Sequence, residues 1–398
     1  MRNTFHKGLV LLMVLCQLVP LFGTSVLADN TEALPIDYQF KDVVVQNTDG
    51  AQAMAAGMTN DPYSSRQWGM KMIGMEAAWQ SGLTGAGVRV AVIDGGVYTN
   101  TGEFGDRLLP GRNMLGEGQS TEDSNGHGTF IAGIIGATKD NGVGIAGIAP
   151  GATIIPIKTS DDGSTQDGVS AQAIYAAVDE FHCDVINYSS GAKQLSSGIR
   201  EAVSYAVSKG VIIVCSTGND GSTTLYYPGA LEDTIGVGSI NKGMERSSFS
   251  HRNKSIFVVA PGEDVYSLGQ SGSAKSSSGT SFSAPFVTGL AALLKEAHPE
   301  MNTDDFRAIL KASCIDLGDA GYDEYYGYGL IQAHEAIRAA AEYFGTTAPD
   351  MPDIPEPTPD PGYNQTIWEQ LFNFSWLREL FQNIIRSLFK GWSPNLTF

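Results

Sequence analysis

Short apolar runs rich in β-branched residues alternate with amphipathic stretches from Val88 onward. Ser170–Phe181 and Ser196–Ser208 carry apolar residues three or four positions apart, which is helical spacing. Strands that are apolar throughout must be buried on both faces, and the intervening helices supply the cover. The sequence therefore predicts an α/β fold with a twisted parallel central sheet, helices on both faces and right-handed crossovers. The predicted strands are Val88–Ile93, Thr153–Ile157, Val185–Tyr188, Val211–Cys215, Thr234–Val237 and Ile256–Val259.

The 398-residue chain is 42% hydrophobic, enough for one large core and accessory segments. We predict one main domain over residues 59–345. The net charge is −18 and no basic stretch is present, which argues against a nucleic acid partner. Of the cysteines outside the N-terminal region, Cys183 and Cys215 fall in or beside strand-like runs and Cys314 stands apart, so no disulfide framework is indicated.

Residues 1–28 have the three regions of a secretory signal peptide. Arg2 and Lys7 precede the apolar run Leu9–Phe22, and the small-residue segment Ser25–Ala28 follows it. The alternative is a membrane anchor, but this apolar run is shorter than the ~20 residues a spanning helix needs. We expect an exported protein in which residues 29–58, polar and alanine-rich, form a short pro-segment.

The composition changes again after residue 345. Residues 346–363 are acidic and proline-rich, which predicts an extended, semi-rigid linker. In residues 364–392 apolar side chains recur at three- or four-residue steps, as in an amphipathic helix. Such a helix would lie in a membrane interface or bind a partner. Docking onto the main domain, or self-association, is an equal alternative.

Three separated motifs supply a carboxylate, an imidazole and a hydroxyl. They are Val90–Val97 with Asp94, Asn125–Ile135 with His127, and Ser278–Pro285 with Ser281. A serine hydroxyl becomes a good nucleophile only beside a base, and that base needs a third group to hold its tautomer. Asp94 closes a predicted strand, whereas His127 and Ser281 introduce helical runs. Each alone is commonly a turn or cap residue, so the indication lies in the combination.

With these motifs in the order Asp, His, Ser, the chain from about Asn60 to Phe344 resembles the subtilisin-like serine proteases, or subtilases. Asn60–Gln67 looks like the mature N-terminus of their thermitase branch. Gly147–Pro150, Ser216–Asn219 and Ala260–Gly262 fall where subtilases carry similar runs. The resemblance implies a serine endopeptidase that acts on peptide or protein substrates through an acyl-enzyme.

The resemblance also implies roles for residues around the nucleophile. Asn219 would donate to the oxyanion together with the Ser281 backbone N–H. Ser189, Ser190 and Gly191 would form one wall of the primary specificity pocket, and the segment from Ser216 to Gly218 the other. Tyr226 would shorten the pocket floor, and the Asp220 carboxylate at its rim would favour a basic substrate side chain.

A calcium site is implied by the loop Lys139–Ile145. Its ligands would be six hard oxygens, the kind that Ca²⁺ prefers. The alternative is a metal-free turn with Asn and Gly at turn positions. The implied ligands are the carboxylates of Asp61 and Glu103, the side chain of Asn141, and the carbonyls of Lys139, Val143 and Ile145.

Two residues depart from the subtilase pattern. The residue after the catalytic Asp is usually Ser or Thr, but here it is Gly95, and the residue after the nucleophile is often Met, but here it is Phe282. About thirty residues before the domain are also too few for the usual folded pro-domain. The remaining histidines, His251 among them, are interpreted as structural or surface residues.

Three functions stay open at this point. The favoured one is an exported endopeptidase dedicated to processing a secreted precursor or leader peptide, acting near a membrane surface. General extracellular protein degradation is the second. An inactive protease fold that serves as a binding scaffold is the third.

Overall fold

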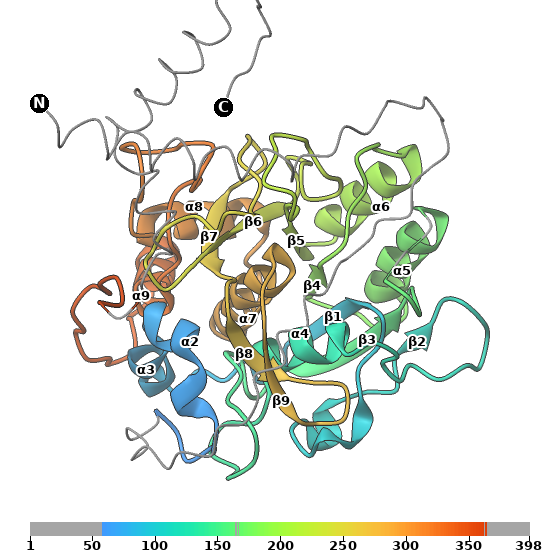
Figure 1. Ribbon diagram of the computed structural model, residues 1–398, viewed down its shortest axis with the longest axis horizontal. Coiled ribbons are helices and arrows are strands. Elements are labelled where there is room, and N and C mark those ends of the chain that lie inside the picture. The colour runs from blue at the N-terminus through green and yellow to red at the C-terminus, as the bar shows by residue number, and fades with distance from the viewer. Residues whose placement is uncertain (1–57, 164, 166, 362, 364–398) are drawn as a thin grey trace, which may run out of the picture. The chain divides into compact units, whose positions relative to one another are not determined.

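The computed structural model describes residues 58–163, 165, 167–361 and 363. A seven-stranded sheet in the order β2-β3-β1-β4-β5-β6-β7 forms its centre (Figure 1). Every pair of neighbouring strands in it is parallel, which confirms the predicted α/β fold. The strands are β1 Arg89–Asp94, β2 Arg112–Asn113, β3 Thr153–Lys158, β4 Val185–Tyr188, β5 Ile212–Ser216, β6 Ile235–Ile240 and β7 Val258–Pro261.

Alternate residues of the strands enter two separate hydrophobic cores. In β1, Val90 and Val92 belong to the larger core, while Ala91 and Ile93 belong to the smaller one. Side chains of a strand point to opposite faces in turn, so a strand covered on both sides must be apolar at every position. This is why the strands read as continuous apolar runs.

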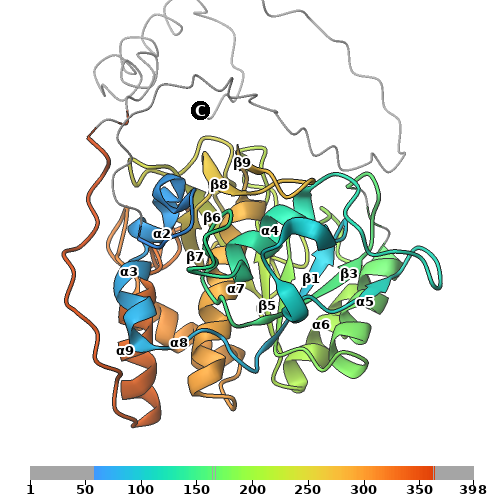
Figure 2. The ribbon, with the colours of Figure 1, turned by 90° about the horizontal axis from the view of Figure 1, so that it is seen from below.

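Helices cover both faces of the sheet. α5 and α6 pack together over the smaller core, whereas α4 and α7 pack together over the larger one. α8 contacts α9, and α9 contacts α3 (Figure 2). The helices are α2 Trp68–Met72, α3 Met75–Ala78, α4 His127–Gly136, α5 Asp167–Asp179, α6 Ser197–Ser208, α7 Thr280–Ala297, α8 Thr303–Ser313 and α9 Ala333–Phe344.

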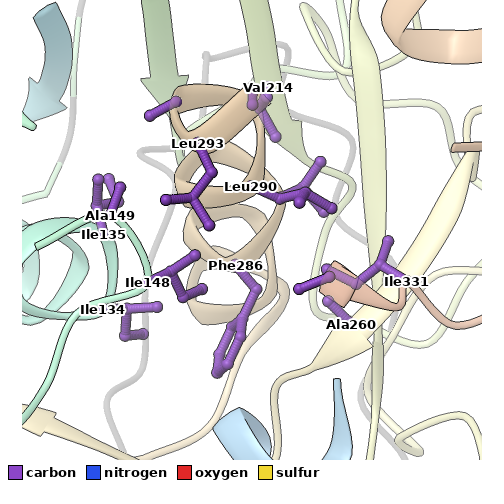
Figure 3. Packing of buried hydrophobic residues seen from close by; sticks show 14 of the residues in the cluster. Ile134, Ile135, Ile148, Ala149, Val214, Ala260, Phe286, Leu290, Leu293 and Ile331 are labelled. Atoms are coloured by element: carbon purple, nitrogen blue, oxygen red, sulfur yellow. The ribbon is translucent and has the colours of Figure 1, made fainter. Parts of the chain in front are cut away.

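α7 is the central helix of the larger core. Its residues from Thr280 to Lys295 are all buried. Phe286, Leu290 and Leu293 pack among residues of α4, β5, β7 and the loop that carries Ile148 (Figure 3). A helix that is enclosed on all sides holds its first turn in a fixed position relative to the sheet.

The order of the strands places a switch point beside β1. β3 lies on one side of β1 and β4 on the other, with α4 on one face of the sheet and α5 on the opposite face. In open α/β sheets such a point opens a crevice at the carboxyl ends of the strands. Asp94 is the last residue of β1, so it lies at this crevice.

A second, antiparallel sheet was not predicted from the sequence. It is the hairpin of β8 Val265–Leu268 and β9 Ala274–Ser277, which packs on α4. Ser267 Oγ donates a hydrogen bond to the carbonyl of Phe130 at 2.7 Å. The residues of β9 are all half-buried, so this strand lacks the apolar run that marks the others.

The proline-rich segment is extended, and it is held along the domain (Figure 2). Met351 is buried, and Arg338 donates to its carbonyl at 3.2 Å and to the carboxylate of Asp353 at 2.7 Å. Farther on, Tyr363 Oη donates to Glu263 at 2.9 Å. The segment is therefore packed along the domain through these contacts.

Several predicted segments lie outside the described residues: the signal peptide 1–28, the pro-segment up to residue 57, and the amphipathic helix 364–392. Within the described part of the chain, no helix is long and apolar enough to cross a bilayer. Cys183, Cys215 and Cys314 carry free thiols.

Candidate active site

The three residues that the sequence motifs predicted to be catalytic come from three different elements at one edge of the sheet. Asp94 ends β1, His127 is the first residue of α4, and Ser281 is the second residue of α7. All three are buried. Because α4 and α7 pack against each other and α4 packs on β1, their N-terminal turns are fixed beside the end of that strand.

Asp94 and His127 form a close pair. Nδ1 of His127 lies 2.9 Å from Oδ1 and 2.8 Å from Oδ2 of Asp94. A ring nitrogen that faces a carboxylate carries the proton, so in the neutral ring Nε2 is the acceptor. The N–H of Gly95 donates to Asp94 Oδ1 at 2.7 Å, so the backbone holds the carboxylate where subtilases usually place a hydroxyl.

Two opposing effects set the pKa of His127. Burial lowers it, but the charge of Asp94 and its hydrogen bond raise it by more, so the pKa stands above the ordinary value. The negative charge of Asp123 adds to this increase. The site therefore stabilises the positive form of the imidazole, which is the form produced when the ring accepts a proton.

Ser281 packs against the segment that follows β4. Its Oγ donates to the carbonyl of Ser189 at 3.4 Å, and Ser189 Oγ donates to the carbonyl of Ser281 at 2.9 Å. The ring of Phe282 lies 5.3 Å from that of His127 and 4.3 Å from that of Phe130. This aromatic group joins the first turns of α4 and α7.

Asn219 has a fixed amide orientation. Its Oδ1 accepts two hydrogen bonds from Thr280, one from the N–H and one from the hydroxyl, both at 2.8 Å. The N–H of Gly218 donates to the same Thr280 hydroxyl at 3.2 Å. Because the oxygen is the acceptor for both donors, the amide nitrogen is the atom left to donate beside Ser281.

Asp123 was not recognised from the sequence. Its Oδ2 accepts from the N–H and the hydroxyl of Thr129 at 2.8 and 2.6 Å. Its Oδ1 accepts from the N–H groups of Asn125 and Gly126 at 3.0 and 2.8 Å. One buried carboxylate thus caps the helix that begins at His127. The available signal was an Asp just before a helix start, which is typical of a cap.

A small pocket of about 20 Å³ is lined by Asp94 and His127. The hydroxyl residues Thr159, Ser160 and Thr165, which follow β3, line one side of it. No sequence motif marked these residues, because they reach the site only through the position of β3 next to β1.

The residues predicted for the specificity pocket lie next to the nucleophile. Ser189, Ser190 and Gly191 follow β4, while Ser216 ends β5 and leads to Gly218. The half-exposed carboxylate of Asp220 lies against Nε2 of the buried ring of His251. Burial lowers the pKa of this ring by more than the charge of Asp220 raises it, so the contact is an ion pair only when the ring is protonated. His251 was interpreted as a structural or surface residue, and the structure places it here.

The residues predicted to bind calcium also lie together. The two carboxylate oxygens of Asp61 accept from the N–H groups of Asp140 and Asn141 at 2.9 and 3.0 Å. Glu103 accepts from the N–H of Ile145 at 3.0 Å and from the side-chain amide of Asn141 at 3.2 Å. Lys139 and Val143 belong to the same loop.

The chemistry of this loop fits a hard cation. Burial of the fully enclosed carboxylate, together with the charge of Asp61, raises the pKa of Glu103 to about 7. A Cβ at Gly144 would stand 1.9 Å from the Glu103 carboxylate, so only glycine lets the loop approach so closely. In the described part of the chain no three His, Cys, Asp or Glu side chains are grouped to hold a metal, so half of the ligands would be backbone carbonyls.

Comparison with known proteins agrees with this geometry. The family model described as "Subtilase family" matches residues 85–329. Subtilisin BL from Lederbergia lenta is 35% identical over 276 residues, which cover 68% of this chain and 98% of that protein. Thermitase from Thermoactinomyces vulgaris is 34% identical over 281 residues, which cover 70% of this chain and 99% of that protein.

Two further likenesses differ in their coverage. The minor extracellular protease Epr from Bacillus subtilis is 35% identical over 284 residues, but the match spans only 43% of its length. A solved protease structure from Pseudoalteromonas arctica is similar with a TM-score of 0.65 and 28% identity, covering 71% of this chain and 100% of that one.

Proposed function

Because the chain belongs to the subtilase family, we propose that Ser281, His127 and Asp94 are its nucleophile, general base and orienting carboxylate. The protein is a serine-type endopeptidase. The observation that carries the residue assignment is the convergence of β1, α4 and α7, which holds Nδ1 of His127 within 2.9 Å of both Asp94 oxygens.

The reaction uses these groups in turn. Nε2 of His127 takes the proton of Ser281 as Oγ attacks the scissile carbonyl, and later gives a proton to the leaving amine. Asp94 holds the ring in the tautomer that makes Nε2 the acceptor, and its charge stabilises the imidazolium. Water then attacks the acyl-enzyme. Nε2 of His127 accepts a proton from this water and gives a proton back to Ser281 Oγ, which releases the second product.

Asn219 is proposed to stabilise the tetrahedral intermediate. Its Oδ1 is anchored to Thr280, so the amide nitrogen is aimed before the substrate arrives. The N–H of Ser281, in the first turn of α7, is the second donor. Donors fixed in advance stabilise a developing oxyanion more than mobile water does.

The test of this assignment is labelling with a fluorophosphonate, which reacts with an activated serine. We expect labelling of the wild-type protein and none of Ser281→Ala. Ser283→Ala is the matched control, because Ser283 is also buried and lies two residues farther along α7. Labelling of Ser281→Ala, or none of the wild type, would overturn the assignment.

We further propose that the enzyme is exported and processes a secreted precursor or leader peptide. Support for export comes from the sequence of residues 1–28 and from Epr, which is named as an extracellular protease. Support for restricted cleavage comes from Tyr226, His251 and Asp220, which contact one another around the proposed specificity pocket. Contact with a membrane surface or a partner through residues 364–392 is a part of this proposal that rests on sequence alone.

New N-termini in the secretome of the producing cells distinguish processing from general degradation. The active enzyme and Ser281→Ala are added to the same secreted proteins, and the new termini are identified by mass spectrometry. A few cleavage sites confined to one or two proteins support processing. Cleavage of most abundant secreted proteins supports general degradation instead.

We also propose that Asp61, Glu103 and Asn141, with the carbonyls of Lys139, Val143 and Ile145, hold a structural calcium ion. The ion would neutralise the carboxylates of Asp61 and Glu103, which accept hydrogen bonds from the backbone of the loop Lys139–Ile145. It takes no part in peptide hydrolysis, so its contribution is to stability.

A further inference from the structure

The position of the substrate side chain follows from the contacts of the nucleophile. Ser281 is bonded to Ser189 on one side, and Thr280 is bonded to Gly218 and Asn219 on the other. A carbonyl held between Ser281 Oγ and the Asn219 amide therefore sits between these two segments. The side chain of the residue that carries it, the P1 residue, must enter the gap between Ser189–Gly191 and Ser216–Gly218.

The ring of Tyr226 packs against the first of these segments. A methyl group built on Gly191 would lie 3.4 Å from Cβ and 3.6 Å from Cδ1 of Tyr226, which is van der Waals contact. The backbone of the next residues holds this arrangement, because Ala192 and Tyr227 exchange N–H···O bonds of 2.9 and 2.8 Å. The ring of Tyr226 therefore lies directly against this segment.

The ring of His251 packs against the second segment. A Cβ at Gly218 would stand 2.4 Å from Cε1 of His251, closer than real carbon atoms approach. Gly218 also has φ of +114°, so glycine is required here for both reasons. The rings of Tyr226 and His251 meet edge to face with centroids 5.1 Å apart. Together the two rings bridge the distance from one segment to the other.

Both nitrogens of His251 face oxygen atoms. Nδ1 lies 3.0 Å from the carbonyl of Thr224, and Nε2 is in contact with the carboxylate of Asp220. The ring is fully buried. The Asp220 carboxylate therefore lies against the ring that supports Tyr226.

We propose that Tyr226, supported by His251 and Asp220, closes the P1 pocket and restricts this peptidase to small P1 side chains such as glycine, alanine or serine. This inference rests on the proposed nucleophile and oxyanion donor, since they define where the P1 side chain enters. It replaces the expectation that Asp220 selects a basic side chain.

The test compares peptides that differ only at P1, with Ala, Leu, Phe or Arg in otherwise identical sequences. For the wild type we expect kcat/KM to be highest with Ala and ~10- to 100-fold lower with Phe, the range that a mismatched pocket gives. Tyr226→Gly should raise kcat/KM for Phe by a similar factor, mainly through KM, and change the value for Ala little. His251→Ala should relax the selectivity in the same direction but less.

Matched variants exclude nonspecific effects. Tyr226→Phe keeps the ring and should keep the wild-type ratio of Ala to Phe cleavage. Tyr205→Ala removes a partly buried tyrosine from α6 and should leave the ratio unchanged. The inference is overturned if the wild type prefers Leu or Phe, or if Tyr226→Gly leaves the ratio unaltered.

Two other results separate this inference from the proposed function. A preference for Arg that disappears in Asp220→Ala would show that the carboxylate reads a basic residue, which contradicts the closed pocket but keeps the triad. Absence of fluorophosphonate labelling in a folded wild type would overturn the triad itself. Labelling combined with cleavage after large residues overturns only the closed pocket.

Discussion

Single side chains at this site are held by partners that leave one atom available for chemistry. Thr280 occupies the oxygen of Asn219, and Asp94 occupies Nδ1 of His127. In each case the other polar atom of the group is the one that we propose to take part in the reaction. Because such partners fix the orientation of these side chains before the reaction, no free energy is spent on reorienting them as charge develops. This is the basis of electrostatic preorganisation.

Replacing Asn219 tests this arrangement. Asn219→Ala should lower kcat by about 10²–10³, the range known for the equivalent donor in subtilisin, with little change in KM. The effect falls on kcat because the bond forms only with the oxyanion. Steady-state kinetics on one peptide measure it. If kcat/KM fell by the same factor through a higher KM, with kcat unchanged, Asn219 would instead bind the substrate in its ground state.

The raised pKa of His127 predicts the acid limb of the pH profile. The ring must be neutral to accept a proton, so kcat/KM should fall as the pH drops through a value above 6.5. The raised pKa also links folding stability to pH. The stability that the His127–Asp94 pair contributes is fully present below the pKa of His127 in the unfolded chain, and it is lost as the pH rises through the pKa of His127 in the folded protein. A pH series of kcat/KM measures the limb.

The matched variant for this prediction is Asp94→Asn. It should shift the acid limb to lower pH, because the charge that raises the pKa of His127 is removed, and lower kcat by roughly 10⁴ through the wrong tautomer. An acid limb that stays in place in Asp94→Asn would assign it to another group.

At the scale of elements, the first turn of α4 depends on a capping side chain that lies outside the helix. The helix begins directly at His127, and its first N–H groups have no partners within the helix. Asp123 is the capping group, since it accepts hydrogen bonds from Thr129, Asn125 and Gly126. The position of His127, the proposed general base, therefore depends on Asp123, to which we assign no role in the reaction itself.

Asp123→Ala should lower the free energy of unfolding by about 2 kcal/mol, the upper range for a lost cap, and also lower kcat. The control is Asn302→Ala in α8, where the same kind of cap accepts from the N–H groups of Asp304 and Asp305. It should cost about 1 kcal/mol and leave kcat unchanged. Chemical unfolding and kinetics on both variants measure this. Equal effects on kcat would contradict a local role.

The elements differ in how far the sequence could predict them. β4 Val185–Tyr188 was predicted to the residue, because its ends coincide with a change from apolar to polar sequence. β2, with two residues, and the half-buried β9 carry no such run and were missed. Strand and helix starts near Asp94, His127 and Ser281 were predictable, but the pairing of Asp220 with His251 was not. That contact joins residues far apart, and only the fold brings them together.

At the scale of the whole molecule, the loop Lys139–Ile145, which we propose to bind calcium, links the N-terminal segment to the domain. Asn60 and Asp61 accept hydrogen bonds from the backbone of the loop at Asp140–Gly142. An ion bound there stabilises the folded chain by mass action, by about 2.7 kcal/mol when its concentration is 100 times Kd.

Removing calcium should therefore lower the melting temperature without changing the chemical step. We expect a lower Tm in excess EGTA than in calcium, and a difference much smaller in Glu103→Gln, which lacks one charged ligand. Asp106→Asn, a neighbouring change outside the ligand set, should keep the full difference. Identical melting curves with calcium and with EGTA would favour the metal-free turn.

The central position of β1 has a consequence for when the enzyme becomes able to act. β1 pairs with β3 and β4, so its two neighbours in the sheet are segments that lie about 60 and 90 residues later in the sequence. Such distant pairings form slowly, because long loops must close first. Ser281 belongs to a still later segment. Hydrolytic activity should therefore arise as one of the last events of folding. A nascent or half-folded chain should not cleave the proteins around it.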